Sequence, residues 1–292
     1  MKWQITIAQP PGYAASECFR EVAETLLHGL RRMGETASIG LNILSPGARH
    51  ILLGAHLLGV RQCAMTPSGS ILYNLEPFTT KEDRPSLLQR YVDLARRMRV
   101  WDYSSANLAE WQRARVTAKV VPIGYVPEIR KVFPLFEGSE DDAVEFPEKD
   151  IDVLFYGATN ARRQAVLEGL SHAGLSVTHF TDVYGHSRDS AIARAKVVLN
   201  MHFYESRGVN SSIFEMVRVS YLMANGVAVV TEESVDIPDD LRPGLAVVPY
   251  GALVETCRGI VNSVDRRRDL ERTAFECFRR HPEEEILRAA IA

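Results

Sequence analysis

The chain has 292 residues, of which 46% are hydrophobic and 24% charged, a composition typical of globular proteins and sufficient for two domains. Its formal net charge of -3 argues against a protein that mainly binds nucleic acid or an acidic membrane surface. No segment approaches the roughly 20 apolar residues of a membrane-spanning helix, and the amino-terminal segment is typical of a strand and turn, not of a secretory signal. We therefore expect a cytoplasmic protein without a transmembrane segment; peripheral membrane contact stays open.

In the first half of the chain, strand-like and helix-like segments alternate. The helix-like segments carry apolar residues at helical spacing and cover residues 17–33, 87–98 and 105–112. The strand-like segments are short and apolar, and cover residues 3–9, 37–44, 50–53, 71–75, 99–103 and 116–122. Strands that alternate with helices predict a parallel, doubly wound sheet.

The alternation restarts after an acidic, apolar-poor stretch at residues 137–149, which is typical of an exposed loop. Predicted strands then cover residues 152–156, 176–180, 197–201, 227–231 and 245–249. Predicted helices cover residues 162–172, 188–195, 214–225 and 253–264, and a charged helical segment follows from Asp265. The sequence thus predicts an α/β protein of two Rossmann-like domains, residues 1–125 and 126–292, whose parallel sheets face a cleft.

Polar side chains gather in the loop between the predicted strand 197–201 and the helix after it. His202, Tyr204 and Glu205 follow the strand directly. Ser211 or Ser212 is expected to cap the helix. The helix N-terminus offers unpaired N–H groups and partial positive charge, which suits a diphosphate.

Glu215 lies at the start of that helix and has two interpretations. Its carboxylate either opposes the helix dipole favourably or accepts hydrogen bonds from a ribose diol. The sequence alone does not choose between them.

The second half of the chain resembles the nucleotide-binding region of GT-B-fold glycosyltransferases, in particular those of the spore-maturation type. The resemblance rests on an ordered set of segments, namely residues 152–163 (DVLFYGATNARR), 200–202 (NMH), 214–215 (FE) and 224–232 (ANGVAVVTE). Residues 120–127 (VVPIGYVP) resemble the crossover between the two domains of that fold. The resemblance also implies that the C-terminal helix packs back on the first domain.

The resemblance implies roles for individual residues of the second domain. Glu215 would bind the donor ribose, Gly157 would let the chain approach the phosphates, and Arg162 or Arg163 would neutralise the diphosphate. His202, Tyr204, Ser211 and Ser212 would complete the donor site. Related retaining enzymes carry a glutamate seven residues before the ribose glutamate, whereas Glu205 precedes Glu215 by ten positions. Glu205 is therefore a catalytic candidate whose equivalence to that glutamate is open.

In the first domain, further candidates lie at the ends of predicted strands. His56 is a candidate general base for an acceptor hydroxyl, because its ordinary pKa lies near neutrality, and Glu76 is a second. Gly12, Tyr13 and Asp102 are candidates for the acceptor side. A histidine at a strand end can equally be a structural residue, and Gly12–Tyr13 can equally be an ordinary turn.

Neither a metal nor another cofactor is expected. The cysteines, Cys18, Cys63, Cys257 and Cys277, form no C-x-x-C pair and are expected to be reduced. The D-x-D pattern at Asp150 and Asp152 precedes its strand, away from the edge where ligands bind. In the GT-B fold, helix N-termini and arginines can stabilise the leaving-group charge instead.

The sequence therefore predicts a metal-independent glycosyltransferase. It would move a sugar from a nucleotide-diphosphate donor to a carbohydrate, lipid-linked or other hydroxyl acceptor, without a nucleic-acid partner. Two alternatives stay open: a non-catalytic nucleotide-binding or scaffold protein on the same fold, and a nucleotide-sugar epimerase.

Overall fold

The computed structural model describes residues 2–78, 85–132, 148–203 and 212–292. The chain divides into two compact units. We call Met1–Val126 together with His281–Ala292 unit 1, and Pro127–Arg280 unit 2. The last twelve residues thus belong to the same compact unit as the amino-terminal half.

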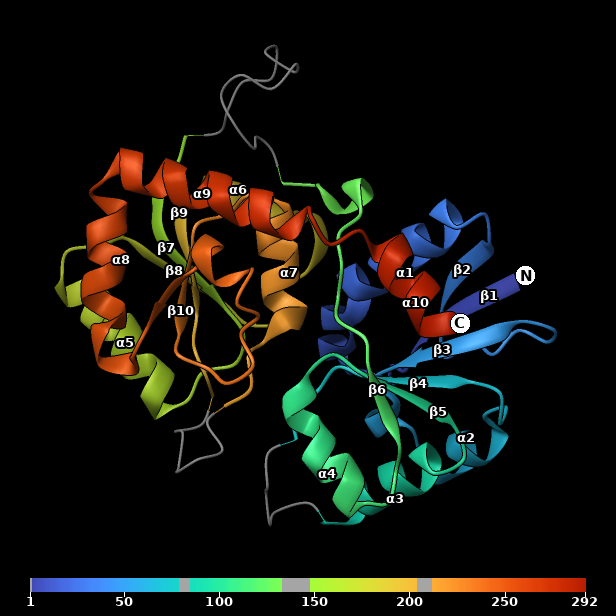
Figure 1. Cartoon of the computed structure of the whole chain (residues 1–292). Helices are drawn as coiled ribbons and strands as arrows, with labels where there is room; N and C mark the ends of the chain where they lie inside the picture. Colours follow the sequence, from blue (N-terminus) through green and yellow to red (C-terminus); the bar gives the residue numbers. More distant parts are fainter. Residues whose placement is uncertain (1, 79–84, 133–147, 204–211) are drawn as a thin grey trace. The chain divides into compact units, whose positions relative to one another are not determined.

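Unit 1 is built on a parallel sheet with the strand order β2-β1-β3-β4-β5-β6 among the described residues. Helices α1 and α10 cover one face of this sheet, and α2, α3 and α4 cover the other (Figure 1). The strands are β1 (Lys2–Ile7), β2 (Thr36–Leu41), β3 (Arg49–Leu53), β4 (Ile71–Asn74), β5 (Arg99–Asp102) and β6 (Ala118–Val120). The helices are α1 (Arg20–Arg32), α2 (Val60–Met65), α3 (Pro85–Ala95), α4 (Leu108–Arg113) and α10 (Glu283–Ile291).

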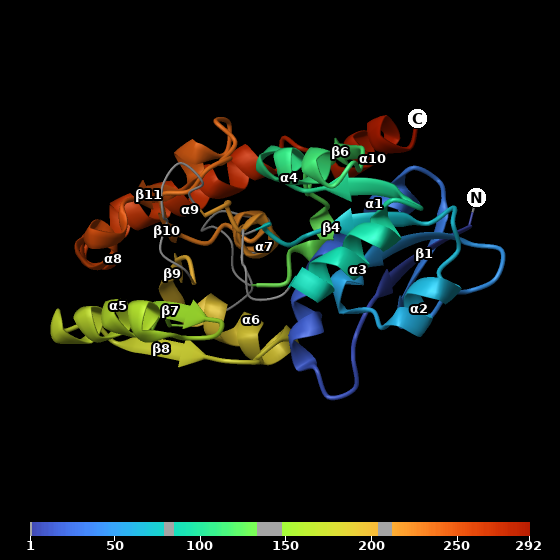
Figure 2. The same cartoon turned by 90° about the horizontal axis from the view of Figure 1, so that it is seen from below.

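Unit 2 is built on a second parallel sheet, whose described strands have the order β11-β10-β9-β7-β8. Figure 2 shows this sheet from below. The strands are β7 (Ile151–Tyr156), β8 (Val177–Phe180), β9 (Ala195–Asn200), β10 (Val229–Glu232) and β11 (Ala246–Val248). The helices are α5 (Ala161–His172), α6 (Gly185–Arg194), α7 (Met216–Ala224), α8 (Leu253–Val261) and α9 (Val264–Phe278).

Each sheet is buried between helices, which explains why its strands are runs of apolar residues. In unit 1, Leu52 and Leu72 pack with Tyr91 of α3 and Trp111 of α4 in one apolar cluster. In unit 2, β7, β9 and β10 pack against α5 and α8 in a second cluster, whose members include Phe155, Leu199, Leu170 and Ile260. The predicted fold class, two parallel-sheet α/β domains, is confirmed.

Helix α10 is held tightly in unit 1, against α1 and the segment that follows β6. A Cβ on Gly29 of α1 would lie 2.5 Å from Cγ of Glu283, so only glycine permits this approach. The Gly124 amide donates to Oε2 of Glu283 at 2.7 Å. Burial raises the pKa of Glu283 to about 8, so this carboxyl is mostly protonated at neutral pH.

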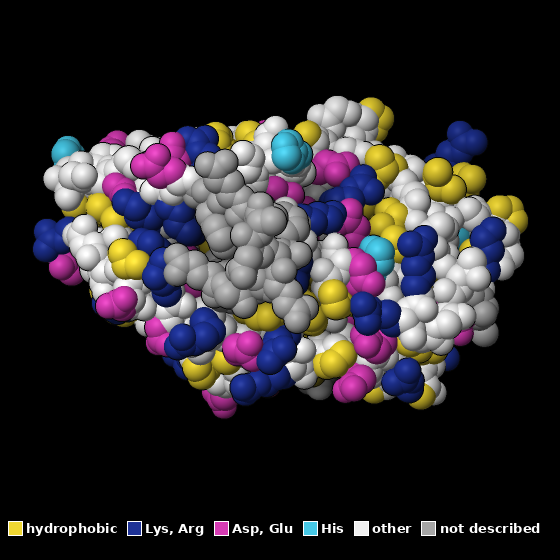
Figure 3. Space-filling view, turned by 90° about the horizontal axis from the view of Figure 1, so that it is seen from above, with side chains coloured by type: hydrophobic (Ala, Val, Ile, Leu, Met, Phe, Trp, Pro, Cys, Tyr) yellow, Lys and Arg dark blue, Asp and Glu magenta, His cyan; other side chains and the backbone are white. Residues whose placement is uncertain are grey.

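The basic run Arg266–Arg268 lies on α9, where acidic and basic residues three positions apart form ion pairs. Asp269 pairs with Arg272, and Glu276 pairs with Arg279. On the face drawn in Figure 3, Lys and Arg side chains are interspersed with Asp and Glu side chains. The run is therefore part of a mixed-charge helix surface. Within the described residues, no helix is long and apolar enough to cross a membrane.

Candidate active site

The best-defined polar cluster of unit 2 lies at the point where the order of its strands reverses. From β7 the chain moves to β8 on one side and then to β9 on the other, so the reversal falls between β7 and β9. Open parallel sheets bind ligands beyond the carboxyl ends of the strands at this reversal. Arg163 of α5, the helix that follows β7, bonds here to residues that follow β9.

The Arg163 guanidinium connects these two strand ends through main-chain carbonyls. Its Nη1 donates to the carbonyl of Ala158 at 2.7 Å, its Nη2 to Met201 at 2.6 Å, and its Nε to His202 at 3.3 Å. Only 4% of the side chain is exposed, and burial lowers the pKa of Arg163 to about 10. Arg163 thus stays protonated at neutral pH, and much of its hydrogen-bonding capacity is used within unit 2.

Arg162 is held by a buried carboxylate at the end of β10. Its Nη1 donates to Oε2 of Glu232 at 2.9 Å, and its Nη2 contacts Oε1 of the same side chain. The guanidinium also lies 3.9 Å from the centre of the Tyr250 ring. Glu232 accepts a further bond from the main-chain N–H of His202 at 3.0 Å. This bidentate pair joins the ends of β9 and β10 to the first turn of α5.

Glu215 and Arg218 form the third part of the cluster, where α7 begins. Oε2 of Glu215 lies 2.8 Å from Nη1 of Arg218, and its Oε1 lies 3.6 Å from Nη2 of Arg163. Arg218 also donates to Oδ1 of Asn200, the last residue of β9, at 2.7 Å. The Glu215 side chain keeps 27% of its surface exposed.

Gly157 directly follows β7 and faces the arginines. Its φ of +133° is a conformation that other residues rarely adopt. A Cβ at this position would lie 3.2 Å from Nη2 of Arg218 and 3.7 Å from Nη1 of Arg163. The glycine therefore keeps the space in front of both guanidinium groups clear.

His202 is buried, and its ring nitrogen Nε2 contacts the residues that follow β10. Its Nε2 lies 2.9 Å from Oγ of Ser234 and 3.3 Å from the carbonyl of Glu233. Since the Ser234 hydroxyl donates to the Glu232 carbonyl, Nε2 must carry the proton that both of its neighbours accept. Burial lowers the pKa of His202, so the neutral ring is favoured.

Several predicted donor-site residues fall in or beside a part of the chain outside the described residues. Tyr204, Glu205 and Ser211 lie outside the described ranges. Ser212 is described, but the prediction that a serine caps the next helix is wrong for it. Helix α7 begins at Met216 with Glu215 at the N-cap position. The chain before it is extended, because Ile213 forms a parallel bridge with Val235.

His56 of unit 1 lies in a short helical turn after β3. Its ring contacts Phe19 and Tyr91 edge-on, with centroid distances of 6.3 and 6.1 Å. Burial lowers the pKa of His56 to about 4, so the ring is neutral at physiological pH and is a weaker base than an exposed histidine. Glu76, the second candidate base, follows β4 and is partly buried. Both catalytic roles stay predictions.

Asp102 ends β5 and is completely buried. Each of its carboxylate oxygens accepts two N–H bonds, of 2.7–2.9 Å; the donors are Asn74 Nδ2, Ser104 N, Asn107 Nδ2 and Trp111 Nε1. Burial raises the pKa of Asp102 to about 6, while these bonds lower it. The acceptor-side role stays a prediction; the contacts indicate that Asp102 fixes the loop after β5.

The acceptor-side candidates Gly12 and Tyr13 form a turn after β1. Gly12 has a φ of +74°, and the Tyr13 amide donates to the Pro10 carbonyl at 3.0 Å. The Tyr13 side chain is 45% exposed. The geometry fits both the ordinary turn and a surface loop that contacts a ligand, so this role also stays a prediction.

The sequence analysis missed three residues of the unit 2 cluster as site residues: Asn200, Arg218 and Glu232. Glu215 and Arg218 are spaced at i,i+3, which is a recognisable pairing signal on a helix. Asn200 and Glu232 end β9 and β10, which pair in parallel. Each lies within one residue of the end predicted for its strand, so the predicted strand ends alone place them close together. Their partners, however, are 18 and 70 residues away. Within the described residues, no group of His, Cys, Asp and Glu side chains forms a metal site.

The two parallel sheets and their helices define the GT-B fold, as comparison with solved structures shows. AviGT4, a glycosyltransferase involved in avilamycin A biosynthesis, superposes with a TM-score of 0.62 and 17% identity over 100% of this chain and 96% of that chain. Sucrose-phosphate synthase from Thermosynechococcus elongatus matches with a TM-score of 0.58 and 12% identity over 99% and 98% of the two chains. A trehalose-6-phosphate structure from E. coli, bound with UDP-2-fluoro glucose, matches with a TM-score of 0.52 and 10% identity over 100% and 98%.

Sequence comparison gives more limited likeness. No protein-family model matches the chain. The uncharacterized protein L138 of Acanthamoeba polyphaga mimivirus is 29% identical over 110 residues, which is 36% of this chain and 12% of that protein. The uncharacterized protein L137 of the same virus is 30% identical over 136 residues, 41% of this chain and 18% of that protein. The chain therefore matches less than a fifth of the length of these relatives.

Proposed function

We propose that this protein is a glycosyltransferase that binds a nucleotide-diphosphate sugar in unit 2 and transfers the sugar to a hydroxyl acceptor. One observation carries the proposal: Arg163 and Arg218 lie beside Gly157 at the strand reversal of a GT-B-type sheet, and Arg162 shares the His202 carbonyl with Arg163. The likeness to a structure that contains UDP-2-fluoro glucose supports this donor class. Fold likeness by itself does not establish the activity, so the proposal depends on the arginine cluster.

Arg218 is the guanidinium best placed to bind the diphosphate. Its Nη1 is engaged with Asn200 and Glu215, and its Nη2 lies next to the open side of Gly157. Arg162 and Arg163 are fixed by the protein and add positive charge behind that space. The N-terminus of α5 adds a partial positive charge, which favours an anion further.

Glu215 is proposed to bind the ribose of the donor. Its partly exposed carboxylate is held in place by Arg218 and Arg163, and it can still accept bonds from the two ribose hydroxyls. In this arrangement one cluster binds both the diphosphate and the ribose of the donor.

The chemistry requires stabilisation of the nucleoside diphosphate as it leaves and removal of a proton from the acceptor. Fixed arginines and a helix N-terminus can stabilise the developing negative charge without reorganisation. His56 is neutral at physiological pH and is one candidate for the base, while Glu76 and Glu205 remain alternatives. The acceptor hydroxyl would be bound by unit 1.

Titration calorimetry with UDP, GDP, dTDP, ADP and CMP tests the donor site. We expect micromolar binding of one nucleoside diphosphate, at least tenfold weaker binding in Arg218→Met, and weaker binding in Glu215→Gln. Arg258→Met serves as the matched control, because Arg258 lies on α8 and is 50% exposed. Unchanged affinity in both site variants would contradict the proposed site.

Product analysis with the matching nucleotide sugar then tests the activity. Transfer of the sugar to an added hydroxyl compound supports a glycosyltransferase. Nucleotide binding without any transfer or hydrolysis supports the non-catalytic alternative, and conversion of the donor to an epimer supports the epimerase.

A further inference from the structure

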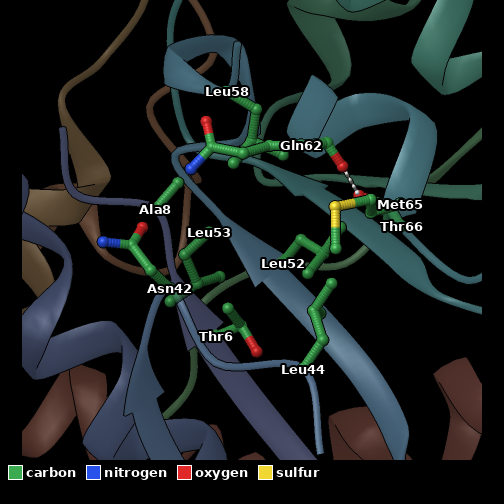
Figure 4. A pocket seen from close by; sticks show the side chains of 10 residues that line it. All are labelled: Thr6, Ala8, Asn42, Leu44, Leu52, Leu53, Leu58, Gln62, Met65 and Thr66. Carbon is green, nitrogen blue, oxygen red and sulfur yellow. Dashed lines mark hydrogen bonds between the residues drawn. The ribbon is translucent and has the colours of Figure 1, made fainter. Parts of the chain in front are cut away.

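Unit 1 contains a pocket of about 230 Å³ at the carboxyl ends of β1, β2 and β3, beneath α2 (Figure 4). Leucines supply most of its apolar wall: Leu52 and Leu53 from β3, with Leu44 and Leu58 from the flanking loops. Met65 of α2 lies at its edge and is 67% exposed. None of the side chains that line the pocket is charged.

The pocket occupies the strand reversal of unit 1. From β1 the chain moves to β2 on one side and then to β3 on the other, so the reversal falls between β1 and β3. Ala8 and Leu53, which line the pocket, meet at this place, where the Ala8 amide donates to the Leu53 carbonyl at 2.9 Å. Unit 1 thus has a hollow where doubly wound sheets bind their ligands.

Polar groups around the pocket are mostly fixed by the protein. Asn42 exchanges two hydrogen bonds with the Gln9 main chain, at 2.7 and 2.9 Å, and Thr6 donates to the Ile43 carbonyl at 2.7 Å. Oε1 of Gln62 accepts from the Gly59 amide at 2.8 Å, so its Nε2 group provides donors. In Figure 4 the amides of Asn42 and Gln62 lie toward the Ala8 end of the pocket.

We infer that this pocket binds an uncharged aromatic group of the acceptor; this identification of the acceptor class rests on the proposed function. An apolar cavity of roughly 150 Å³ binds benzene, so about 230 Å³ admits a substituted or fused ring. The pocket lies between the sheet and α2, and the Met65 thioether at its edge can make favourable contacts with an aromatic ring. A rigid ring also loses less conformational freedom on binding than an acyl chain of equal volume.

The experiment uses the full chain and two probes, 2-naphthol, which is uncharged at pH 7, and 2-naphthalenesulfonate, which carries a charge on the same ring system. Binding is measured by naphthyl fluorescence and calorimetry without nucleotide. We expect 2-naphthol to bind at least tenfold more tightly than the sulfonate, because the pocket offers no cation. Equal affinity for the two probes, or binding of 1-octanol in preference to 2-naphthol, would overturn the inference.

Two variants of α2 locate the binding. Met65→Trp fills the edge of the pocket and is expected to weaken 2-naphthol binding at least tenfold. Val60→Trp is the matched control, since Val60 is 72% exposed on the same helix and does not line the pocket. Equal effects of the two variants would overturn the inference. Met65→Asp, which places a charge at the edge without bulk, must weaken binding too.

The two proposals can fail separately. If 2-naphthol binds in the pocket and no nucleoside diphosphate binds, the proposed function is wrong and the assignment of an acceptor falls with it. If a nucleoside diphosphate binds and 2-naphthol does not, the aromatic acceptor is wrong and the donor site stands.

Discussion

The strand reversals of the two sheets have the same topology and opposite chemistry. In unit 1 the reversal is lined by leucines and uncharged amides, whereas in unit 2 it is surrounded by arginines 162, 163 and 218 and by carboxylates 215 and 232. The fold provides a strand reversal in both units, and the side chains around it decide which ligand it can bind. Under the two proposals, unit 2 binds an anionic ligand and unit 1 an uncharged one.

The units also differ in how they keep charge buried. Unit 2 pairs its buried arginines with carboxylates and carbonyls. In unit 1, two deeply buried carboxyl groups accept N–H hydrogen bonds: Asp102 accepts four, and Glu283 accepts one from the Gly124 amide. Removing one side chain should therefore have different consequences in the two units.

Arg163→Met should have the largest effect on stability. It leaves the buried carbonyls of Ala158, Met201 and His202 without their donors, and we expect it to destabilise the protein by about 3–5 kcal/mol. Chemical denaturation measures the free energy of unfolding. In the control Arg258→Met, which replaces an exposed arginine of unit 2, this free energy should change by less than about 0.5 kcal/mol. A variant that loses nucleotide binding at full stability would show that Arg163 serves the ligand alone.

Asp102→Asn should come next, with a loss of about 2–3 kcal/mol. Asparagine has one acceptor oxygen, so its amide nitrogen would face two of the N–H donors that now bond to the carboxylate. Thermal unfolding compares it with Asp93→Asn, whose side chain is 59% exposed in the wild type. If both substitutions cost the same, the buried carboxylate does not organise the end of β5.

Glu283→Gln tests the buried carboxyl of α10 through the pH dependence of protein stability. Because the folded pKa of about 8 lies above the ordinary value of 4.5, the folded protein binds the proton more tightly and loses stability as pH rises between these values. Relative to the wild type, the free energy of unfolding of the Gln variant should rise by about 1.4 kcal/mol per pH unit across that range. Denaturation curves at several pH values measure this difference, and parallel profiles would contradict the buried, protonated state.

The dependence of binding on salt gives the smallest and most direct contrast. Between 50 and 500 mM NaCl, we expect nucleoside diphosphate affinity to fall by about tenfold and 2-naphthol affinity to change by less than about twofold. Calorimetry on the same preparation measures both. Equal salt dependence would remove the chemical distinction between the two strand reversals.

The sequence predicted the sheets well because buried parallel strands are apolar runs that are visible locally. Every described strand overlaps a predicted one. Helix α2 was missed, since its six residues, VRQCAM, are too few to show a helical period. The last predicted helix is interrupted at Pro282 and forms α9 and α10. The proline is visible in the sequence, but charged residues lie on both sides of it and together predict one helical segment.

The candidate site was predictable only in part. Gly157, Arg162, Arg163, His202 and Glu215 do come together, since all of them lie at or near strand ends of one sheet. What the sequence did not reveal is how these residues pair. Arg162 meets Glu232, a partner 70 positions away, and Arg163 meets carbonyls that carry no residue-specific signal. The pocket of unit 1 was missed because its aliphatic lining cannot be distinguished from ordinary core in the sequence.

The return of α10 to unit 1 has a consequence for the order of events during synthesis. Glu283 packs against Gly29 of α1 and accepts a hydrogen bond from the Gly124 amide. The ribosome adds Glu283 only after all of unit 2. Unit 1 therefore cannot complete its packing until the last residues of the chain are available, whereas all residues of unit 2 are made before them. Helix α10 is in this sense the last step of folding for the part of the chain that is made first.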